Sequence, residues 1–557
     1  MPQFDEKKQE KQIEELRYRE EEELARILSE KYGVPYTDLS RVAINTEALR
    51  LLSEEEARAA EVAAFNKLGK KIELAVRAPA KGETAGIVKK LEERGYSVTT
   101  FMVSQASLER AWERYKDLSF AVETKAGVLD ISGEDIQKII ADIKTLADTT
   151  TLIEETLKLK RAYRVSRILE VILGGAFATD ASDIHIEPEE SYVRLRYRLD
   201  GLLTDVIIFD AETYNLLLSR IKLVSGLKLN VKDTAQDGRF SVAIDQDDIE
   251  IRTSILPGAY GESIVLRLLN PKTIGLPMEK LGIEPRLYEI LAREIKKPNG
   301  MILTTGPTGS GKTTALYAFL KKIHKPGIKI ITIEDPIEYH LPGIVQTQAD
   351  RKKYTFSSGL RSALRQDPDV IMIGEIRDEE VAETAINAAL TGHLVFSTLH
   401  TNNAAGAFPR IIDLDVNPKV ISSAVNLVMA QRLVRVLCPV CKKEAPFSEE
   451  EKRLVERVIS SVVKKENIPE NTAHSWKPGG CAACHEGYKG RIGIFEAIRM
   501  DEAIEKLVKE SASEREIHDG ARPQGILSLV EDGVIKVLNG VTSFEDLARV
   551  IDLEEAH

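Results

Sequence analysis

The segment GPTGSGKTT, at residues 306–314, restricts the fold of this chain more than any other stretch of its 557 residues. An apolar run, GMILTTG at 300–306, precedes it, and TALYAFLKKI at 314–323 follows with the pattern of a helix. In such a strand, loop and helix, the glycines permit a tight loop whose backbone N–H groups converge on phosphate oxygens. The segment therefore predicts an α/β domain that binds a nucleotide.

The predicted nucleotide contacts lie within this loop. Lys312 is expected to meet the terminal phosphates, and Thr313 is expected to ligate Mg²⁺. The predicted nucleotide-binding residues are Gly306, Pro307, Thr308, Gly309, Ser310, Gly311, Lys312, Thr313 and Thr314.

Two later apolar runs end in acidic residues that suit hydrolysis. IKIITIEDPIE delivers Glu334, and DPDVIMIGEIRD delivers Glu375. Gly374 stands where many phosphate-loop enzymes have a metal-binding Asp, so Glu375 is expected to act through water, as a base or in the outer shell of Mg²⁺. The alternative is that these acids only cap strand ends.

A third apolar run, LTGHLVFSTLHTNN at 390–403, carries His393 and His400 at its two ends. If it forms a further strand of the same sheet, the histidines could sense the γ-phosphate. A purely structural role is equally compatible with the pattern.

All four cysteines fall into two C-x-x-C pairs, Cys438/Cys441 and Cys481/Cys484, with 39 residues between the pairs. Two such pairs predict one tetrahedral Zn²⁺ site, structural because four thiolates leave no open position for a substrate. Disulfides are the rival prediction, disfavoured in a reducing compartment. His485 could also replace one ligand.

Composition favours a cytoplasmic chain. The net charge of −11 argues against broad attraction to nucleic acid, so no nucleic-acid partner is expected. No apolar run reaches the length of a membrane span, and the first residues lack the apolar core of a signal peptide. A role at a membrane would therefore require a protein partner.

Hydrophobic periodicity and breaker residues divide the chain into modules. The charged start is expected to pack only through its last turns, near Leu24, Ile27 and Leu28. Several strands of the second domain carry arginines at alternate positions, so one sheet face is expected to be basic. The predicted parts are a charged arm at 1–30, an α+β domain at 31–115, a linker at 116–145, a second domain at 146–269, a hinge at 270–285, and a nucleotide-binding domain at 286–557 with the cysteine insertion at about 436–490.

Eight motifs in one order resemble the secretion ATPase superfamily, the motors of type II secretion and type IV pilus assembly. They span about residues 30 to 550 and read ATDASDIHIEP, RLRYRLDG, QDGRFSV, GPTGSGKTT, ITIEDPIE, LRQDPDVIMIGEIRD, TGHLVFSTLHTN and the paired C-x-x-C. The resemblance implies an ATP-hydrolysing homohexamer at the cytoplasmic face of the inner membrane. It also implies a RecA-like motor, a PAS-like α+β middle domain and a small α+β N-terminal docking domain.

The resemblance also assigns roles to residues of the motor. Glu375 falls on the catalytic glutamate, and Glu334 would support Mg²⁺ and water. His393 and His400 bound the family's His box. The implied partners are a membrane platform protein and a cytoplasmic adaptor.

Arginines of the middle domain reach the nucleotide in this family. The fifteen-residue spacing in IRTSILPGAYGESIVLRLL matches that pattern at Arg252 and Arg267. The sequence does not rank the further candidates Arg239, Arg196 and Arg198.

Three features favour an assembly motor over a retraction motor: the extra N-terminal domain, the four cysteines, and the ending at 525–551. The retraction signature AIRNLIRE is absent, and so are N-terminal repeats beginning RLG, which makes regulation by cyclic di-GMP doubtful. A type II secretion motor, a nucleotide-gated scaffold and a DNA-translocating ATPase are the alternatives.

Overall fold

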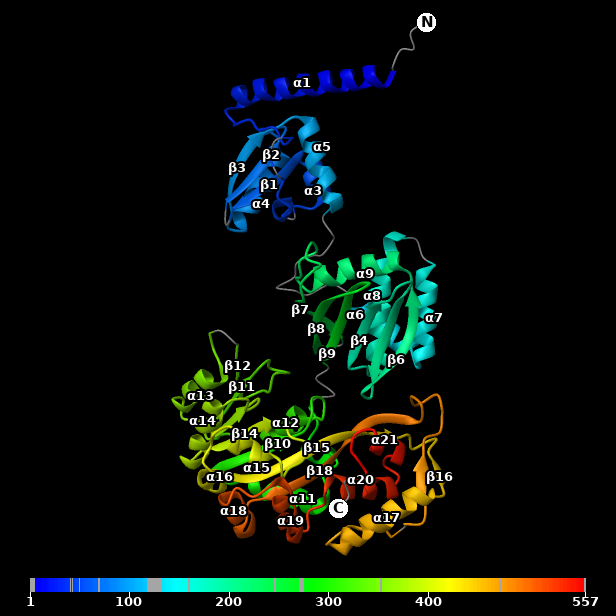
Figure 1. Cartoon of the computed structure of the whole chain (residues 1–557). Coiled ribbons are helices and arrows are strands. Elements are labelled where there is room, and N and C mark those ends of the chain that lie inside the picture. The colour runs from blue at the N-terminus through cyan, green and yellow to red at the C-terminus, as the bar shows by residue number, and fades with distance from the viewer. Residues whose placement is uncertain are drawn as a thin grey trace. The chain divides into compact units, whose positions relative to one another are not determined.

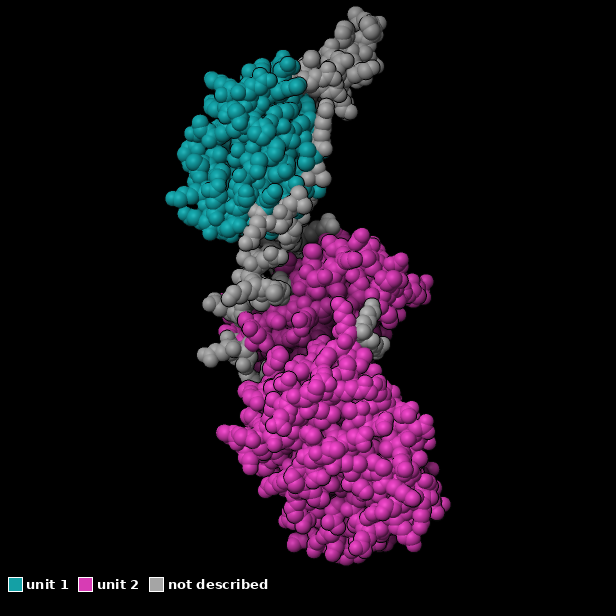
Figure 2. All heavy atoms as spheres, turned by 90° about the vertical axis from the view of Figure 1, so that its left-hand side faces the viewer, with its two compact units in different colours: residues 1–123 teal, residues 124–557 magenta. Residues whose placement is uncertain are grey.

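Internal contacts separate the polypeptide into two units, residues 1–123 and 124–557 (Figure 2). The computed structural model describes residues 6–554 apart from 41, 43, 50, 69–70, 118–132, 159–160, 245–246, 270–274, 351–352 and 471. Parts of the predicted linker and hinge, 118–132 and 270–274, therefore lie outside the described residues. No helix within the described part of the chain is long and apolar enough to cross a membrane.

The first unit is an α+β domain preceded by a long helix (Figure 1). Its three-stranded sheet pairs β1 with β2 antiparallel and β2 with β3 parallel. The elements are α1 (Glu6–Tyr32), α2 (Thr46–Leu49), α3 (Glu54–Ala59), β1 (Val62–Leu68), β2 (Lys71–Val76), α4 (Gly82–Glu93), β3 (Ser97–Met102), α5 (Gln105–Glu113) and the 3-10 helix η1 (Arg114–Asp117).

Helix α1 packs differently from the expectation. Leu24 and Ile27 are 57% and 60% exposed, whereas Ala25 and Ser29 are buried. Glu22 accepts hydrogen bonds from the Ser104 and Ser107 hydroxyls, near the start of α5. Helix α1 is therefore held by polar contacts and by small buried residues. Leu24 and Ile27, two of the three apolar residues expected to pack, remain exposed.

The middle domain, the first part of the second unit, is built on a six-stranded sheet with the order β6-β5-β4-β9-β8-β7. Along β5, Val193, Leu195 and Tyr197 point into the core, and the arginines between them point to the opposite face. The elements are α6 (Gly133–Asp142), α7 (Leu146–Leu157), α8 (Arg161–Ala178), β4 (Asp183–Pro188), β5 (Val193–Leu199), β6 (Leu202–Phe209), α9 (Ala211–Val224), β7 (Gln236–Ile244), β8 (Asp247–Gly258) and β9 (Gly261–Leu269).

Two predicted boundaries of this domain need correction. Ile136 and Ile139 of α6 are buried in the same core as the sheet, so the domain includes residues from 133 that were predicted as linker. At the other end, Met278 and Leu281 are buried in the motor core, so the described part of the predicted hinge belongs to the motor.

The motor domain has a seven-stranded sheet with the order β12-β11-β13-β14-β10-β15-β18. All neighbouring strands are parallel except β18, which pairs antiparallel with β15. Its first elements are η2 (Met278–Lys280), α11 (Pro285–Glu294), β10 (Gly300–Thr305), α12 (Lys312–Ile323), β11 (Ile330–Glu334), β12 (Val345–Gln348), α13 (Phe356–Leu364), β13 (Val370–Ile373), α14 (Glu379–Leu390) and β14 (Leu394–Leu399).

The remaining elements complete the sheet with its last two strands and add the C-terminal helices (Figure 1). They are α15 (Ala407–Ile412), α16 (Pro418–Ala424), β15 (Val425–Leu437), β16 (Lys443–Ala445), α17 (Glu449–Ser461), η3 (Lys465–Asn467), β17 (Ser475–Lys477), β18 (Tyr488–Arg499), α18 (Glu502–Lys509), α19 (Glu514–Ala521), η4 (Arg522–Gln524), α20 (Leu529–Leu538) and α21 (Phe544–Ala548). Since β10, β11, β13 and β14 are parallel, their carboxyl ends meet at one edge of the sheet, where ligands bind in open α/β folds.

Candidate active site

The phosphate loop connects β10 to α12 at the carboxyl edge of the sheet. Gly311 has a φ of +88°, and a Cβ atom there would lie 2.7 Å from Nε2 of Gln431. Only glycine combines that backbone conformation with so close a neighbour. The loop therefore turns sharply and directs the start of α12, with its unpaired N–H groups, at the space above the edge.

Lys312 is the first residue of α12 and is largely buried. Its ammonium donates to the carbonyl oxygens of Gly306 at 2.7 Å and Pro307 at 3.0 Å. Burial lowers the pKa of Lys312 to about 8, an effect that Glu375 opposes and Arg432 strengthens. A phosphate would restore the charged form of this lysine.

Ser310, inside the same loop, is buried, and its hydroxyl has no hydrogen-bond partner within the described residues. A buried hydroxyl without a partner is costly unless a ligand completes it. Thr313 and Thr314 follow in the first turn of α12 and are half-buried. The loop therefore fits a bound phosphate group.

Glu334 ends β11 and is almost fully buried. Its Oε1 accepts from the Thr332 hydroxyl at 2.5 Å and from Gln346 Nε2 at 3.2 Å, and its Oε2 accepts from the Tyr317 hydroxyl. Burial raises the pKa of Glu334, and these hydrogen bonds oppose the rise. Three side chains, from α12, β11 and β12, therefore hold this carboxylate in one position at the end of its strand.

Glu375 lies at the same edge, two residues after β13. Its Oε1 pairs with the guanidinium of Arg377, and its Oε2 lies 3.3 Å from His400 Nε2. Gly374 holds this turn in place, because its N–H donates to β11 and its carbonyl accepts from Thr398 at 2.8 Å. The structure thus places Glu375 beside His400 and close enough to Lys312 to affect the charge of that lysine.

His393 is not part of this group. It directly precedes β14, at the amino end of the strand, where its Nδ1 lies 3.0 Å from the carbonyl oxygen of Ala388. Seven residue steps along the strand separate it from His400, about 23 Å at 3.3 Å per residue. Of the two predicted histidines, the folded chain brings only His400 to the carboxyl edge.

Arg432 is a neighbour of the phosphate loop that the sequence did not reveal. It lies on β15, is nearly buried, and donates to the carbonyl oxygens of Gln431 at 3.0 Å and Asn402 at 2.6 Å. Its charge contributes to the lowered pKa of Lys312. Only the pairing of β15 with β10, more than a hundred residues away in sequence, places it there.

Three arginines of the middle domain lie side by side in the sheet register. Arg239 on β7 is opposite Arg252 on β8, which is opposite Arg267 on β9. Asp183 on β4 continues the row, and its Oδ1 accepts from Arg267 Nε at 2.9 Å. Directly opposite residues share one face of an antiparallel sheet, so this face carries a stripe of positive charge.

The arginines differ in how strongly they are paired. Arg252 donates to Glu338 Oε2 at 3.0 Å and to the carbonyl oxygen of Ile337, in the motor segment that follows β11. Arg196 is held by both oxygens of Glu187 at 2.9 Å. Arg267 and Arg239 remain 58% and 74% exposed. Exposure therefore ranks Arg239 above Arg196 as a further candidate, a distinction that the sequence did not give.

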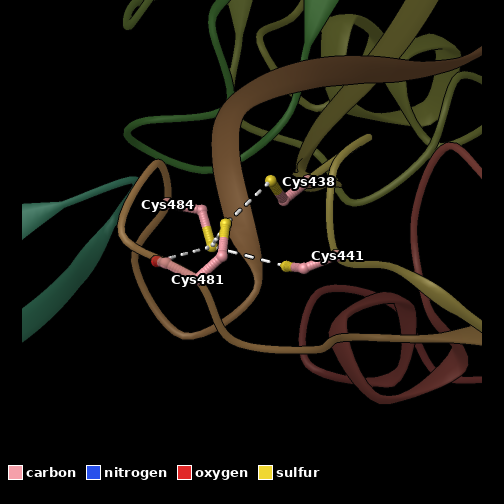
Figure 3. Close-up of side chains that lie close together, drawn as sticks. All are labelled: Cys438, Cys441, Cys481 and Cys484. Atoms are coloured by element: carbon pink, nitrogen blue, oxygen red, sulfur yellow. Dashed lines mark hydrogen bonds between the residues drawn. The ribbon is translucent and has the colours of Figure 1, made fainter.

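The four cysteines converge into one cluster (Figure 3). Cys438 Sγ lies 3.8 Å from Cys481 Sγ, Cys441 Sγ lies 3.6 Å from Cys484 Sγ, and the Sγ atoms of Cys481 and Cys484 lie 3.5 Å apart. A tetrahedron with metal–sulfur bonds of about 2.3 Å has edges of about 3.8 Å. All four thiols are free, so the arrangement fits a Zn²⁺ site rather than disulfides.

His485 does not belong to this cluster. Its Nε2 lies 3.1 Å from the Thr204 hydroxyl of the middle domain. The described groups within reach of one ion are the four cysteine sulfurs. The alternative in which His485 replaces a ligand therefore finds no support in the structure.

Comparison with known proteins identifies the family. The family model described as type II/IV secretion system protein matches residues 158–549. The chain belongs to this family. A second model, described as the MshEN domain, matches residues 32–121 of the secretion-family chain. The extra N-terminal domain is thus recognised separately from the part that contains the motor.

Named relatives of this secretion-family chain fall into two groups. Type II secretion system protein E of Pseudomonas aeruginosa is 44% identical over 411 residues, covering 73% of this chain and 80% of that protein. Type IV pilus assembly ATPase PilB of Myxococcus xanthus is 36% identical over 531 residues, covering 95% and 91%. The solved pilus retraction motor PilT with bound ADP aligns at 25% identity with a TM-score of 0.46, covering 68% of this chain and 96% of that one. The chain is an ATPase with a RecA-like motor domain.

Proposed function

We propose that this ATPase is the motor of type IV pilus assembly. It would act as a homohexamer at the cytoplasmic face of the inner membrane and move a platform protein so that pilin subunits join the fibre. The observation that carries the proposal is that a PilB relative covers 95% of the chain, N-terminal unit included, whereas protein E of P. aeruginosa covers 73%. A cytoplasmic adaptor would contact the N-terminal unit.

The carboxyl edge of the motor sheet supports the chemical part of the proposal. Mg²⁺ bound with ATP would offset the charge that develops on the transferring phosphoryl group. Thr313, Glu334 and Glu375 would hold it directly or through water. Lys312 would bind the terminal phosphates, Glu375 would orient and deprotonate the attacking water, and His400 would position Glu375.

Arg252 and Arg267 would complete the site when the middle domain closes over a nucleotide. An arginine on a moving domain stabilises phosphoryl charge only in the closed arrangement, so hydrolysis becomes coupled to domain motion. The pairing of Arg252 with Glu338, four residues after Glu334, supports this assignment because it already directs the basic face at the motor. Zn²⁺ in the cysteine cluster would have a structural role only.

A first experiment measures ATP turnover per chain against protein concentration, with native mass recorded on the same samples and Glu375→Gln as the blank. Turnover should rise as hexamers form. Mixing Lys312→Ala chains with Arg267→Ala chains then tests whether neighbours share a site. Recovery of activity in the mixture supports a ring in which arginines act between chains, and no recovery places them within one chain.

The second candidate function is the type II secretion motor, favoured by the 44% identity to protein E. Capture of purified platform proteins from a pilus machine and from a secretion machine separates the two, since the ATPase parts share their motifs. DNA that neither binds nor stimulates turnover removes the translocase alternative. ATP turnover equal in Glu375→Gln and wild type would instead support a non-hydrolysing scaffold.

A further inference from the structure

The cysteine cluster borders a corner of the middle domain that plays no part in the proposed phosphate chemistry. His485 Nε2 lies 3.1 Å from the hydroxyl of Thr204, and the N–H of Gly490 donates to Asp200 Oδ2 at 3.1 Å. Figure 3 shows the teal hairpin of the middle domain approaching the loop that carries Cys484. We call residues 200–204 the acidic turn and residues 485–491 the receiving loop.

The acidic turn is shaped for this contact. Asp200 and Gly201, which join β5 to β6, have φ angles of +47° and +89°. Positive φ at two successive residues produces a tight hairpin turn that matches the twist of its strands. The Asp200 carboxylate is therefore presented at the tip of a rigid hairpin, where it reaches the backbone N–H of Gly490.

Charge complements the backbone contact. Gly201 faces Arg491, whose Nη1 would lie 3.8 Å from a Cβ atom at that glycine. Surrounding protein lowers the pKa of Arg491, whereas Asp200 and Asp183 raise it. The Arg491 side chain is exposed, so its pairing with Asp200 orients the two surfaces more than it stabilises them.

On the motor side, the receiving loop is fixed by the cysteines and by β15. The N–H of Cys438 donates to Gly487 at 2.8 Å, and His485 and Tyr488 exchange backbone hydrogen bonds of 3.0 and 2.8 Å. The Arg435 guanidinium stacks over Tyr488 at 3.8 Å from the ring centroid. One side of the loop thus depends directly on the geometry of the cysteine pairs.

We propose that the tetracysteine module is the motor's docking surface for its own middle domain, with the metal holding the receiving loop in the shape that accepts the acidic turn. The proposal rests on the zinc assignment and not on ATP hydrolysis. Asp183 links the docking contact to the arginine row, because it lies near Arg491 of the motor and its Oδ1 accepts a hydrogen bond from Arg267. Docking would therefore set where the arginine-bearing strands begin their movement toward a nucleotide.

Hydrogen exchange on the full-length, zinc-loaded chain tests the contact. In Asp200→Lys, amide exchange across 485–491 should become about tenfold faster, because the hydrogen bond to Gly490 is lost and Arg491 is repelled. Glu189→Lys is the matched control, since Glu189 pairs with Arg194 within the middle domain. Unchanged exchange across 485–491 in Asp200→Lys would overturn the proposal.

The role of the metal is tested by removing a cysteine of the motor and measuring exchange in the acidic turn of the middle domain. Cys481→Ser, with zinc content measured on the same sample, should accelerate exchange across the acidic turn while β10 stays protected. Slow exchange there after the metal is lost would refute the role of zinc. If the motor domain unfolds, Asp200→Lys with full zinc still decides the docking. Lys312→Ala should leave both segments protected, which separates failure of this inference from failure of the ATPase assignment.

Discussion

The phosphate loop and the cysteine cluster lie in one domain, but different parts of the chain create them. The loop depends on backbone conformation, with Gly311 at a positive φ against Gln431, and on distant strands that supply Glu375 and Arg432. The cluster depends on four side chains in two local pairs. Loss of a loop side chain should therefore abolish ATP binding or hydrolysis and spare the fold, whereas loss of a cysteine should weaken the fold and spare ATP binding.

Substitutions at the phosphate site give the largest expected effect. Glu375→Gln should lower ATP turnover by about 10²- to 10⁴-fold with ATP binding retained, because a positioned base is lost. Lys312→Ala should abolish measurable ATP binding, which isothermal calorimetry detects. Both variants should melt within a few degrees of wild type. A large loss of thermal stability in either variant would break the separation between the two sites.

Cys481→Ser is the converse test and should act on the fold. Its zinc content should fall, and its melting temperature should drop by roughly 5 to 10 °C, since structural metal binding contributes to folding. Ala483→Ser, a hydroxyl added within the same C-x-x-C pair, controls for the substitution itself. Normal ATP affinity of the folded protein is expected. Wild-type melting after complete loss of zinc would contradict the structural role.

Alanine substitutions at two glycines of the phosphate loop separate the cost of backbone conformation from the cost of a close neighbour. Gly309 and Gly311 have φ of +81° and +88°, but a Cβ atom at Gly309 meets open space. Gly309→Ala should cost about 1 kcal/mol of unfolding free energy through the backbone alone. Gly311→Ala should cost about 1 to 3 kcal/mol more, because buried Gln431 must shift. If denaturant titrations gave equal losses of unfolding free energy for the two variants, Gln431 would be able to move aside without cost.

The smallest expected effect is the uptake of a fraction of a proton by Lys312 when ATP binds. With a pKa of about 8, close to half of Lys312 is neutral at pH 8 in the free chain. Bound phosphates favour the charged form, so ATP binding should take up about half a proton at pH 8 and almost none at pH 6.5. Calorimetry in buffers of different ionisation enthalpy measures this uptake, and Lys312→Arg should abolish it. Uptake that is equal at both pH values would contradict the lowered pKa.

The lowered pKa of Lys312 also makes the free energy of unfolding depend on pH. An unfolded lysine has a pKa near 10.4, so between about pH 8 and 10.4 the unfolded chain binds more protons than the folded one at Lys312. The cost of burying the charge is present in full below pH 8 and is relieved as pH rises through that range. Lys312→Met should remove this component of the pH dependence in chemical denaturation.

The sequence predicted the parts of the site that depend on neighbours along the chain. The phosphate loop and the C-x-x-C pairs are local patterns, and Glu334 and Glu375 each follow an apolar strand. Arg432 escaped prediction because only the pairing of β15 with β10 brings it to the loop. His393 and His400 flank the same apolar run, so the local pattern does not distinguish them. Only the direction of β14 shows that His400 follows the carboxyl end of the strand, where the site lies.

The fold class was predicted correctly, but two segment boundaries differ from the prediction. The α+β pattern follows from periodicity, and the RecA-like motor was implied by the family resemblance that the ordered motifs carry. Residues 133–142 looked like linker because their pattern alone does not say which domain they pack on, and burial of Ile136 and Ile139 supplies that answer. The row formed by Arg239, Arg252 and Arg267 likewise required the strand register.

Strand β15 also limits which changes of chain length the motor can tolerate. Arg432 faces the phosphate loop, and three residues later Arg435 binds Asp546 at 2.6 Å. Because side chains alternate along a strand, one residue inserted between them would reverse the side on which every following residue emerges. Arg435 would lose Asp546, and Cys438 would leave its partners. The spacing between these arginines is therefore fixed to the residue.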